Sequence, residues 1–377
     1  MRFDESFQLP LHHRVIFSAG LLHPSNGVLR DVMTGSGARR AIAFVDAGVE
    51  NANPQGARAL QSWFSAQASA GHTLPDLCSI DIVAGGEAAK NDSAIVDQVI
   101  AATERHSIDR RSFVIAIGGG AMLDAVGLGT TLAHRGVRLI RIPTTTLAMD
   151  DAAMGVKNGI NRFGKKNYVG AFAVPWAVLC DETYLTTLNS RDFRAGFSEA
   201  VKIACLRDPS LLARMEGDAP RIAARDIRVS MPTIIRCAQL HLEHITRGGD
   251  PFELREARPL DFGHWSAHKL ESMSGFAIPH GEAVSIGIAL DCAYAQRVGL
   301  LAKHDAARVT ACLRALQLPT WHPLLEDIDA LLRGLEEFRE HLGGVLTITQ
   351  LTAIGASIDV HEVDAPALRA AVRSLAP

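Results

Sequence analysis

The chain of 377 residues is long enough for two domains, or for one large domain, with a sizeable core. Apolar residues make up 47% and charged residues 21%, which is typical of a soluble globular protein, and a net charge of −3 gives no reason to bind nucleic acid or anionic lipid. No apolar run approaches the roughly 20 residues of a membrane span, residues 1–17 lack the apolar segment of a signal peptide, and six cysteines without a C-x-x-C pair indicate reduced thiols in a cytoplasmic protein.

The first half of the chain alternates between short β-rich runs and longer segments with helical spacing. Strands are expected at 41–46, 79–84, 112–118 and 137–143. This alternation predicts a parallel sheet covered on both faces. From about Ser190, a candidate helix N-cap, the sequence is typical of helices and loops, except for a possible strand at 344–351. We therefore expect a Rossmann-like parallel α/β domain over 1–185 and a mainly helical domain over 186–377, with a ligand cleft between them.

A glycine loop, "IGGGAMLD", follows the expected strand 112–118 and opens a helix. Its glycines allow a phosphate to approach the backbone and the N–H groups of the helix, with Asp124 one turn further on. The loop departs from G-x-G-x-x-G, so it matches the Rossmann pattern only in part, and a tight turn without a ligand is the alternative. The threonines at 144–146, together with Glu87 and Lys90, follow neighbouring strands and favour a nucleotide.

A basic segment follows these threonines. It holds Lys157, Asn161, Lys165, Lys166 and Asn167 among glycines. Cations and amides on a flexible loop suit a phosphate-bearing substrate, whereas the alternative is a solvated surface hairpin.

Three histidines follow in the second half, at His264, His268 and His280. His264 and His268 lie four residues apart and so share one helix face. They could supply two metal ligands, contact a phosphate, or simply face solvent.

Six segments resemble one family when they are taken together. They are "GGGAMLDAVG", "RIPTTTLAMDD", "GVKNGINRFGKKNYVGAF", "GFSEAVKIA", "DFGHWSAHKLE" and "HGEAVSIGIAL". Their order and approximate spacing resemble those of the 3-dehydroquinate synthases and their relatives, the sugar phosphate cyclase superfamily, which includes the 2-epi-5-epi-valiolone synthases. The resemblance extends over residues 40–355. It implies an NAD-binding α/β domain, a helical metal-binding domain, and a cyclisation in which NAD takes a hydride and later returns it.

The resemblance also implies roles for individual residues. Zinc, with cobalt as a possible substitute, would be bound by Glu199, His264 and His280, and such a set leaves positions on the metal open for substrate oxygens. The residues expected on the NAD side are Asp46, Glu87, Lys90, Gly119, Gly120, Asp124, Thr144, Thr145 and Thr187, with Lys166 assigned either there or to the substrate pocket. The expected catalytic and substrate residues are Asp151, Lys157, Lys202, Asp261 and His268, and Lys157, Asn167, His268 and Arg135 are the candidates for the substrate phosphate. Arg135 matches an arginine that reaches a neighbouring subunit, which implies a homodimer.

The sequence departs from the dehydroquinate synthase pattern where that family receives a substrate carboxylate. Asp261 stands in place of an asparagine, an expected lysine aligns near Cys237, and an expected "DKK" aligns with residues 339–341. Two like charges about 4 Å apart cost on the order of 4 kcal/mol at an effective dielectric of 20. This argues against a carboxylate substrate, although Arg255 and Arg258 remain nearby.

The resemblance implies that the valiolone synthases also carry an aspartate at the position of Asp261 and act on sedoheptulose 7-phosphate, a ketose phosphate with an uncharged end. The leading hypothesis is therefore a cyclase of sedoheptulose 7-phosphate. The alternatives are a 3-dehydroquinate synthase with a divergent pocket, a metal-dependent alcohol dehydrogenase of the same fold, and a non-catalytic NAD-binding protein.

Overall fold

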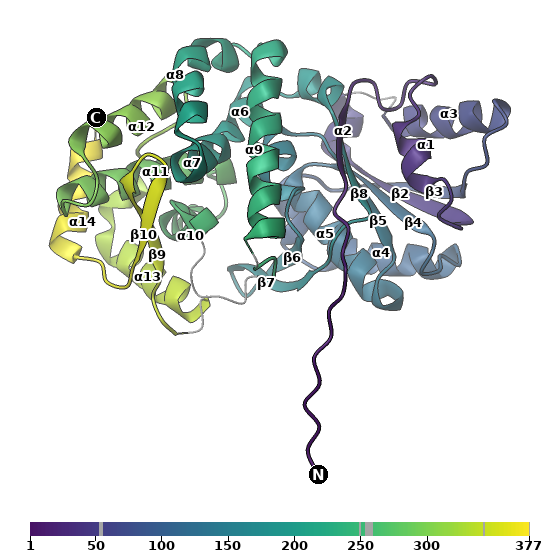
Figure 1. The fold of residues 1–377 in the computed structure, drawn as a ribbon, viewed down its shortest axis with the longest axis horizontal. Coiled ribbons are helices and arrows are strands. Elements are labelled where there is room, and N and C mark those ends of the chain that lie inside the picture. The colour runs from purple at the N-terminus through teal and green to yellow at the C-terminus, as the bar shows by residue number, and fades with distance from the viewer. Residues whose placement is uncertain (53–55, 249, 253–258, 342–343, 377) are drawn as a thin grey trace.

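The structure is a computed structural model that describes residues 1–377 except 53–55, 249, 253–258, 342–343 and 377. Figure 1 shows a half built around a sheet, coloured purple to blue, beside a half made mainly of helices, coloured green to yellow. The first residues extend away from both halves and are exposed. Within the described residues, no helix combines the length and apolar character needed to cross a bilayer.

The sheet-containing half holds six parallel strands in the order β1-β8-β5-β4-β2-β3. The strands are β1 (Val15–Ser18), β2 (Arg40–Asp46), β3 (Asp76–Val83), β4 (Phe113–Gly118), β5 (Arg138–Pro143) and β8 (Ala177–Asp181). The four strands expected from the sequence are confirmed. The sequence pattern did not predict β1 and β8, which are only four and five residues long and form the edge of the sheet beyond β5.

Side chains on the two faces of the sheet belong to two different cores. On β2, Ile42 and Phe44 enter one core, whereas Ala41, Ala43 and Val45 enter the other, as the two-residue period of a strand requires. Helices α4 (Ala94–Arg105) and α5 (Gly120–Leu132) cover the first face, and α1 (Val28–Met33) and α3 (Gly56–Ser69) cover the second. A further short helix, α2 (Ala47–Ala52), follows β2. The expected parallel sheet covered on both faces is confirmed.

The basic segment forms an antiparallel hairpin outside the main sheet, with strands β6 (Lys157–Arg162) and β7 (Lys165–Phe172). Of the two alternatives that the sequence left open, a flexible loop and a hairpin, backbone pairing forms the hairpin. Gly159 and Gly170 face each other across the hairpin, and a Cβ on Gly170 would lie 2.6 Å from the carbonyl oxygen of Asn158. The buried Arg141 of β5 donates hydrogen bonds to the carbonyls of Gly155 and Lys157, which fixes the hairpin to the sheet.

The second half consists mainly of helices, as expected. They are α6 (Ser190–Ala195), α7 (Phe197–Arg207), α8 (Pro209–Ala223), α9 (Ile227–Arg247), α10 (His264–Met273), α11 (His280–Arg297), α12 (Lys303–Ala315), α13 (Ile328–His341) and α14 (Ala365–Leu375). A strand does follow 344, but it is β9 (Ile348–Ala353), paired with β10 (Ala356–Val360). The N-cap of α6 is Asn189, whose side chain accepts from the backbone N–H of Asp192, so the prediction of Ser190 was one residue late.

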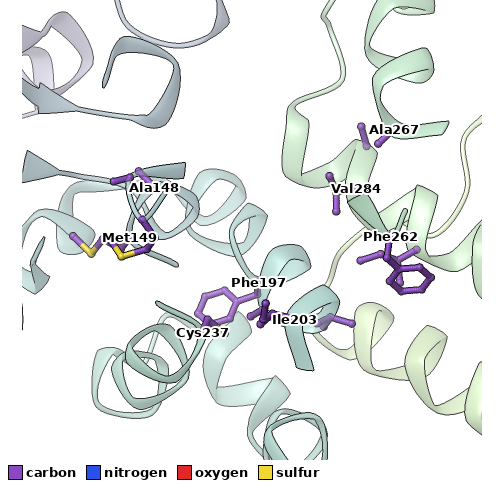
Figure 2. Close-up of a cluster of buried hydrophobic side chains, with 14 of the residues drawn as sticks. Ala148, Met149, Phe197, Ile203, Cys237, Phe262, Ala267 and Val284 are labelled. Carbon is purple, nitrogen blue, oxygen red and sulfur yellow. The ribbon is translucent and has the colours of Figure 1, made fainter. Parts of the chain in front are cut away.

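The two halves share one core. Figure 2 shows Ala148 and Met149, which follow β5, in the same hydrophobic cluster as Phe197, Ile203 and Cys237 of the helical half. The last strand of the sheet ends at Asp181, and the boundary at residue 185 stays a prediction.

Candidate active site

A cavity of about 1010 Å³ lies where the carboxyl ends of the sheet strands meet the helical half. Strand ends are the expected ligand site of an open parallel sheet. The predicted residues that line the cavity are Asp46, Glu87, Lys90, Gly119, Gly120, Asp124, Thr144, Thr145, Asp151, Lys157, Lys166, Asn167, Thr187, Lys202, Asp261, His264, His268 and His280. Segments up to about 230 residues apart in sequence thus converge on one space.

The glycine loop forms one end of the cavity. Helix α5 begins there with Gly119 as N-cap and no side chain capping it, which leaves its first N–H groups open to an anion. Asp46 ends β2 and accepts hydrogen bonds from the backbone N–H groups of Gly48, at 2.7 Å, and Gly119, at 3.4 Å. A Cβ on Gly118 would lie 2.8 Å from Cβ of Asp46, so this close approach requires glycine. These residues fit a dinucleotide.

Two lysines that line the cavity, Lys90 and Lys166, form ion pairs with carboxylates. The Nζ of Lys90 lies 2.7 Å from Oδ2 of Asp124, and Lys90 is buried. The Nζ of Lys166 lies 3.4 Å from Glu87 and 2.5 Å from Glu271. Burial would lower the pKa of Lys166, but Glu271 and Glu87 raise it, so the ammonium stays charged. Lys166 therefore joins the sheet side of the cavity to α10.

The three predicted zinc ligands come together. Glu199 lies in the first turn of α7, His264 begins α10, and His280 begins α11. One ligand atom from each lies within 4.8 Å of the others. The Nε2 atoms of His264 and His280 both lie 3.5 Å from Oε1 of Glu199. Oε2 of Glu199 contacts the ammonium of Lys202, whereas Oε1, which both histidines face, has no well-oriented hydrogen bond, although the residue is 2% exposed. A buried carboxylate oxygen without such a partner fits a metal cation.

The second nitrogen of each ligand histidine has its own partner. Nδ1 of His264 lies 3.2 Å from the carbonyl oxygen of Phe262, and Nδ1 of His280 lies 3.2 Å from Oε2 of Glu271. Such acceptors orient the ring and leave Nε2 free to bind metal. Burial alone would lower the pKa of His280, but Glu271 and Glu199 raise it to about 9. The donor set therefore fits zinc, provided that His280 loses its proton on binding. Sequence reasoning missed Glu271, although it lies seven residues after His264 on the same helix.

His268 is close to these ligands but does not replace one of them. Its ring centroid lies 5.5 Å from that of His264 and 5.9 Å from that of His280. Within the described part of the chain, the groups with metal-binding spacing are Glu199, His264 and His280 on one side and His268, Glu271 and His280 on the other. Neither contains both His264 and His268, so the geometry does not favour the H-x-x-x-H alternative.

Lys202 lies at the centre of an acidic region. It is one turn after Glu199 on α7 and contacts it, and its Nζ lies 3.3 Å from Oδ1 of Asp151. Burial would lower the pKa of Lys202, but Asp151, Glu199 and Asp261 raise it. For Glu199 the effects are opposite: burial would raise its pKa, but Lys202 and His264 hold that pKa well below its usual range.

Asp150, next to Asp151, is a further acid that sequence reasoning missed. It is buried, neither carboxylate oxygen has a hydrogen-bond partner, and burial together with Asp151 and Glu199 raises its pKa.

The candidate phosphate residues do not all converge. Lys157, Asn167 and His268 line the cavity, whereas Arg135 does not. Arg135 is exposed in the turn that follows α5, with a φ of 61°. The structure therefore places Arg135 outside this chain's own cavity, and its proposed role requires a second subunit.

The described residues that align with the expected carboxylate-binding lysines do not line the cavity. Cys237 is buried in the core beside Phe197 and does not line the cavity; His241, one turn later on α9, does. Arg339 pairs with Glu336 and Glu340 pairs with Lys165, and neither lines the cavity. The side chain of His341, and the whole of Arg255 and Arg258, fall outside the described residues.

The parallel sheet joined to a helical half, with its site at their junction, defines the dehydroquinate synthase-like fold. Family models described as 3-dehydroquinate synthase N-terminal and 3-dehydroquinate synthase C-terminal match residues 80–195 and 196–337. The chain belongs to the 3-dehydroquinate synthase family, within the sugar phosphate cyclase superfamily.

Its relatives include enzymes of both kinds considered from the sequence. A 2-epi-5-epi-valiolone synthase of Streptomyces albus is 34% identical over 78% of this chain and 73% of its own. A 3-dehydroquinate synthase of Rhodopseudomonas palustris is 31% identical over 90% of each chain. The structure of ValA, a 2-epi-5-epi-valiolone synthase from Streptomyces hygroscopicus with NAD+ and Zn2+ bound, is 29% identical, with a TM-score of 0.89 over 99% of each chain.

Proposed function

We propose that this protein is a sugar phosphate cyclase that converts sedoheptulose 7-phosphate to a carbocycle with release of phosphate, and that it uses NAD and zinc, or cobalt in place of zinc. The open N-terminus of α5 beside Asp46 and the cluster of Glu199, His264 and His280 support the two cofactors. A ValA structure with NAD+ and Zn2+ bound has the same fold.

The observation that carries the substrate proposal is a pair of carboxylates, Asp151 and Asp261, that line the cavity and both raise the pKa of Lys202. Glu199 also acts on Lys202, but it is assigned to the zinc and is not counted here. A substrate carboxylate placed about 4 Å from one of them would meet a repulsion on the order of 4 kcal/mol at an effective dielectric of 20. Hydroxyl groups, in contrast, donate hydrogen bonds to carboxylates. The site therefore favours a substrate with an uncharged end.

The cofactors supply the redox and Lewis-acid chemistry when they are bound: NAD accepts a hydride from a secondary alcohol and returns it, and zinc polarises the alcohol and ketone oxygens. The protein binds and orients the reacting groups. Gly120, the first residue of α5, presents its backbone N–H group to the cofactor diphosphate, and Gly119, held by Asp46, leaves room for the close approach. Lys90, Asp124, Thr144, Thr145 and Thr187 surround the rest of that end.

On the substrate side, Lys157 neutralises the phosphate as it leaves, and Asn167 and His268 contribute hydrogen bonds to it. Lys166, held between Glu87 and Glu271, fixes the hairpin over this region. Lys202 remains charged and stabilises negative charge on substrate oxygens, with Asp151 fixing its position. Asp261 accepts a hydrogen bond from a substrate hydroxyl.

The experiment that tests this function is incubation of the protein with NAD and zinc or cobalt, with each substrate offered separately. Sedoheptulose 7-phosphate should give inorganic phosphate and a cyclic product, without net NADH, because the hydride returns to the intermediate. Efficient turnover of the carboxylate-bearing precursor of dehydroquinate would instead establish a 3-dehydroquinate synthase. Stoichiometric NADH, followed by absorbance, would establish an alcohol dehydrogenase.

We also propose that the protein acts as a cytoplasmic homodimer in which Arg135 reaches the partner subunit's cavity. The exposed position of Arg135, in a turn that does not line the cavity of its own chain, supports this arrangement. Two inactive variants, Arg135→Ala and Lys202→Ala, should recover part of the activity when their subunits are mixed. In each mixed dimer, the cavity of the Arg135→Ala subunit keeps its own Lys202 and receives an intact Arg135 from the other subunit, so one of the two sites is complete. No recovery after verified subunit exchange would contradict a shared site.

A further inference from the structure

His241 is a polar residue at a position where the pattern of its helix calls for an apolar one. Ser230, Ile234, Cys237 and His241 follow one face of α9 at helical spacing, and all four are buried. Ile234 and Cys237 pack in the main core. His241 is 9% exposed, and its side chain lines the cavity instead. Packing of the helix therefore does not require a histidine here.

The ring of His241 has one neighbour that sets its hydrogen-bonding character. Its Nδ1 lies 3.1 Å from Oδ1 of Asp151, close to it but without the alignment of a full hydrogen bond, and the same oxygen lies 3.3 Å from Nζ of Lys202. Burial would raise the pKa of Asp151, but Lys202 and then His241 hold it below its usual range, so the carboxylate stays ionised. An ionised carboxylate can only accept, so Nδ1 is the nitrogen that carries hydrogen. In the neutral ring, Nε2 then carries a lone pair and accepts.

The consequence concerns what a substrate must offer. Asp151 and Asp261 line the same cavity as His241, and both accept hydrogen bonds when ionised. A hydroxyl group can donate to an imidazole nitrogen, whereas a carboxylate has no hydrogen to donate. A site built to bond a hydroxyl discriminates strongly against a ligand that leaves its polar groups unpaired.

We propose that His241 is a specificity-determining residue that accepts a hydrogen bond from a substrate hydroxyl and so selects a polyol end over a carboxylate end. The inference rests on the proposed function, since it concerns the substrate of the same cavity. It goes further in assigning the selection to a residue of α9, in addition to Asp261.

Three variants separate selection from support of the structure. His241→Leu removes the acceptor at similar volume, His241→Gln keeps an amide oxygen as acceptor, and His241→Lys replaces the acceptor by a cation. Gln239→Ala is the matched control, because Gln239 is exposed on the same helix. For each protein we would measure kcat and KM for sedoheptulose 7-phosphate and for the carboxylate-bearing precursor of dehydroquinate, together with the melting temperature and the NAD dissociation constant.

We expect His241→Leu to raise KM for sedoheptulose 7-phosphate about tenfold, the size of one lost hydrogen bond. His241→Gln should restore most of that loss, and His241→Lys should shift the ratio of kcat/KM values towards the carboxylate substrate by at least about tenfold. Melting temperature and NAD binding should match those of Gln239→Ala. If His241→Leu does not fold, the Gln and Lys variants still decide the ratio.

Two kinds of failure are distinguishable. The inference would be overturned if the substrate ratio were unchanged in both the Leu and Lys variants, or if only kcat fell, equally for both substrates. Either outcome would show that His241 only supports Asp151, while the wild-type result still supported the proposed function. A wild type that prefers the carboxylate substrate, or turns over neither, would overturn the proposed function and this inference with it.

Discussion

Replacing Glu271 with glutamine should weaken zinc binding without unfolding the protein. Glu271 is 2% exposed and accepts from two donors at once, Nζ of Lys166 at 2.5 Å and Nδ1 of His280 at 3.2 Å. The amide of glutamine has one oxygen, which can accept from only one side, so its NH₂ group faces the other of these two donors. Loss of a group that orients a metal-bound histidine typically costs 10–100-fold in metal affinity, about 1.4–2.7 kcal/mol. Because Glu271 also raises the pKa of His280 to about 9, the affinities are compared above that pH, where the ring is already neutral in both proteins.

The stability cost should be smaller than for a fully broken buried ion pair, which is about 3–5 kcal/mol. Lys166 keeps a second partner, Glu87, 3.4 Å away. We therefore expect a loss of about 1–3 kcal/mol in the free energy of unfolding of the metal-free protein. Titration of metal-free protein with zinc against a chromophoric chelator gives the affinity, and denaturant unfolding gives the stability.

Glu337→Gln is the matched control for this prediction. Glu337 pairs with Lys269 of the same helix α10 at 2.6 Å, but its side chain is 52% exposed. Exposed pairs contribute about 0–1 kcal/mol, so this variant should bind zinc as the wild type does. Wild-type zinc affinity in Glu271→Gln, or an equal loss in both variants, would refute the argument that Glu271 orients His280.

Three further predictions follow from the same site and its surroundings. His264→Ala and His280→Ala should lose the single metal ion per chain while His268→Ala keeps it, and metal analysis showing full occupancy in both ligand variants would contradict the assignment. Asp261→Asn should weaken turnover of sedoheptulose 7-phosphate by about 1.5–3 kcal/mol without creating activity on the dehydroquinate precursor; lower metal content with unchanged substrate choice would show instead that Asp261 only supports the helix of His264. Asp291 of α11 accepts hydrogen bonds from the backbone N–H of Gly263 and from Nε1 of Trp265, on either side of His264. Burial raises the pKa of Asp291 to about 7, so its stabilising contribution is complete below about pH 4 and is lost as the pH rises through 7. Unfolding measured across this range should show the wild type losing up to about 4 kcal/mol relative to Asp291→Asn, and parallel curves would refute it.

The sequence by itself determined the parts of the protein that depend on local periodicity. Four strands were predicted because continuous apolar runs between turn residues are typical of strands buried on both faces. Glu199 and Lys202 lie three residues apart on one helix, a spacing that places them on the same face, and the two side chains are in contact. The sequence left open whether the basic segment forms a hairpin, because its pairing depends on a close approach of glycines across the strands and on hydrogen bonds from Arg141, both non-local features.

Only the tertiary structure decided how the site is assembled. The spacing of the histidines left open which two would face Glu199; the start of α11 brings His280, 81 residues after Glu199, to within 3.5 Å of its carboxylate. Along α9 the alignment pointed to Cys237, but the helix turns that residue into the core and His241 towards Asp151. A period of 3.6 residues defines which residues share a face, whereas the packing of that face against other elements decides whether it meets the core or the cavity.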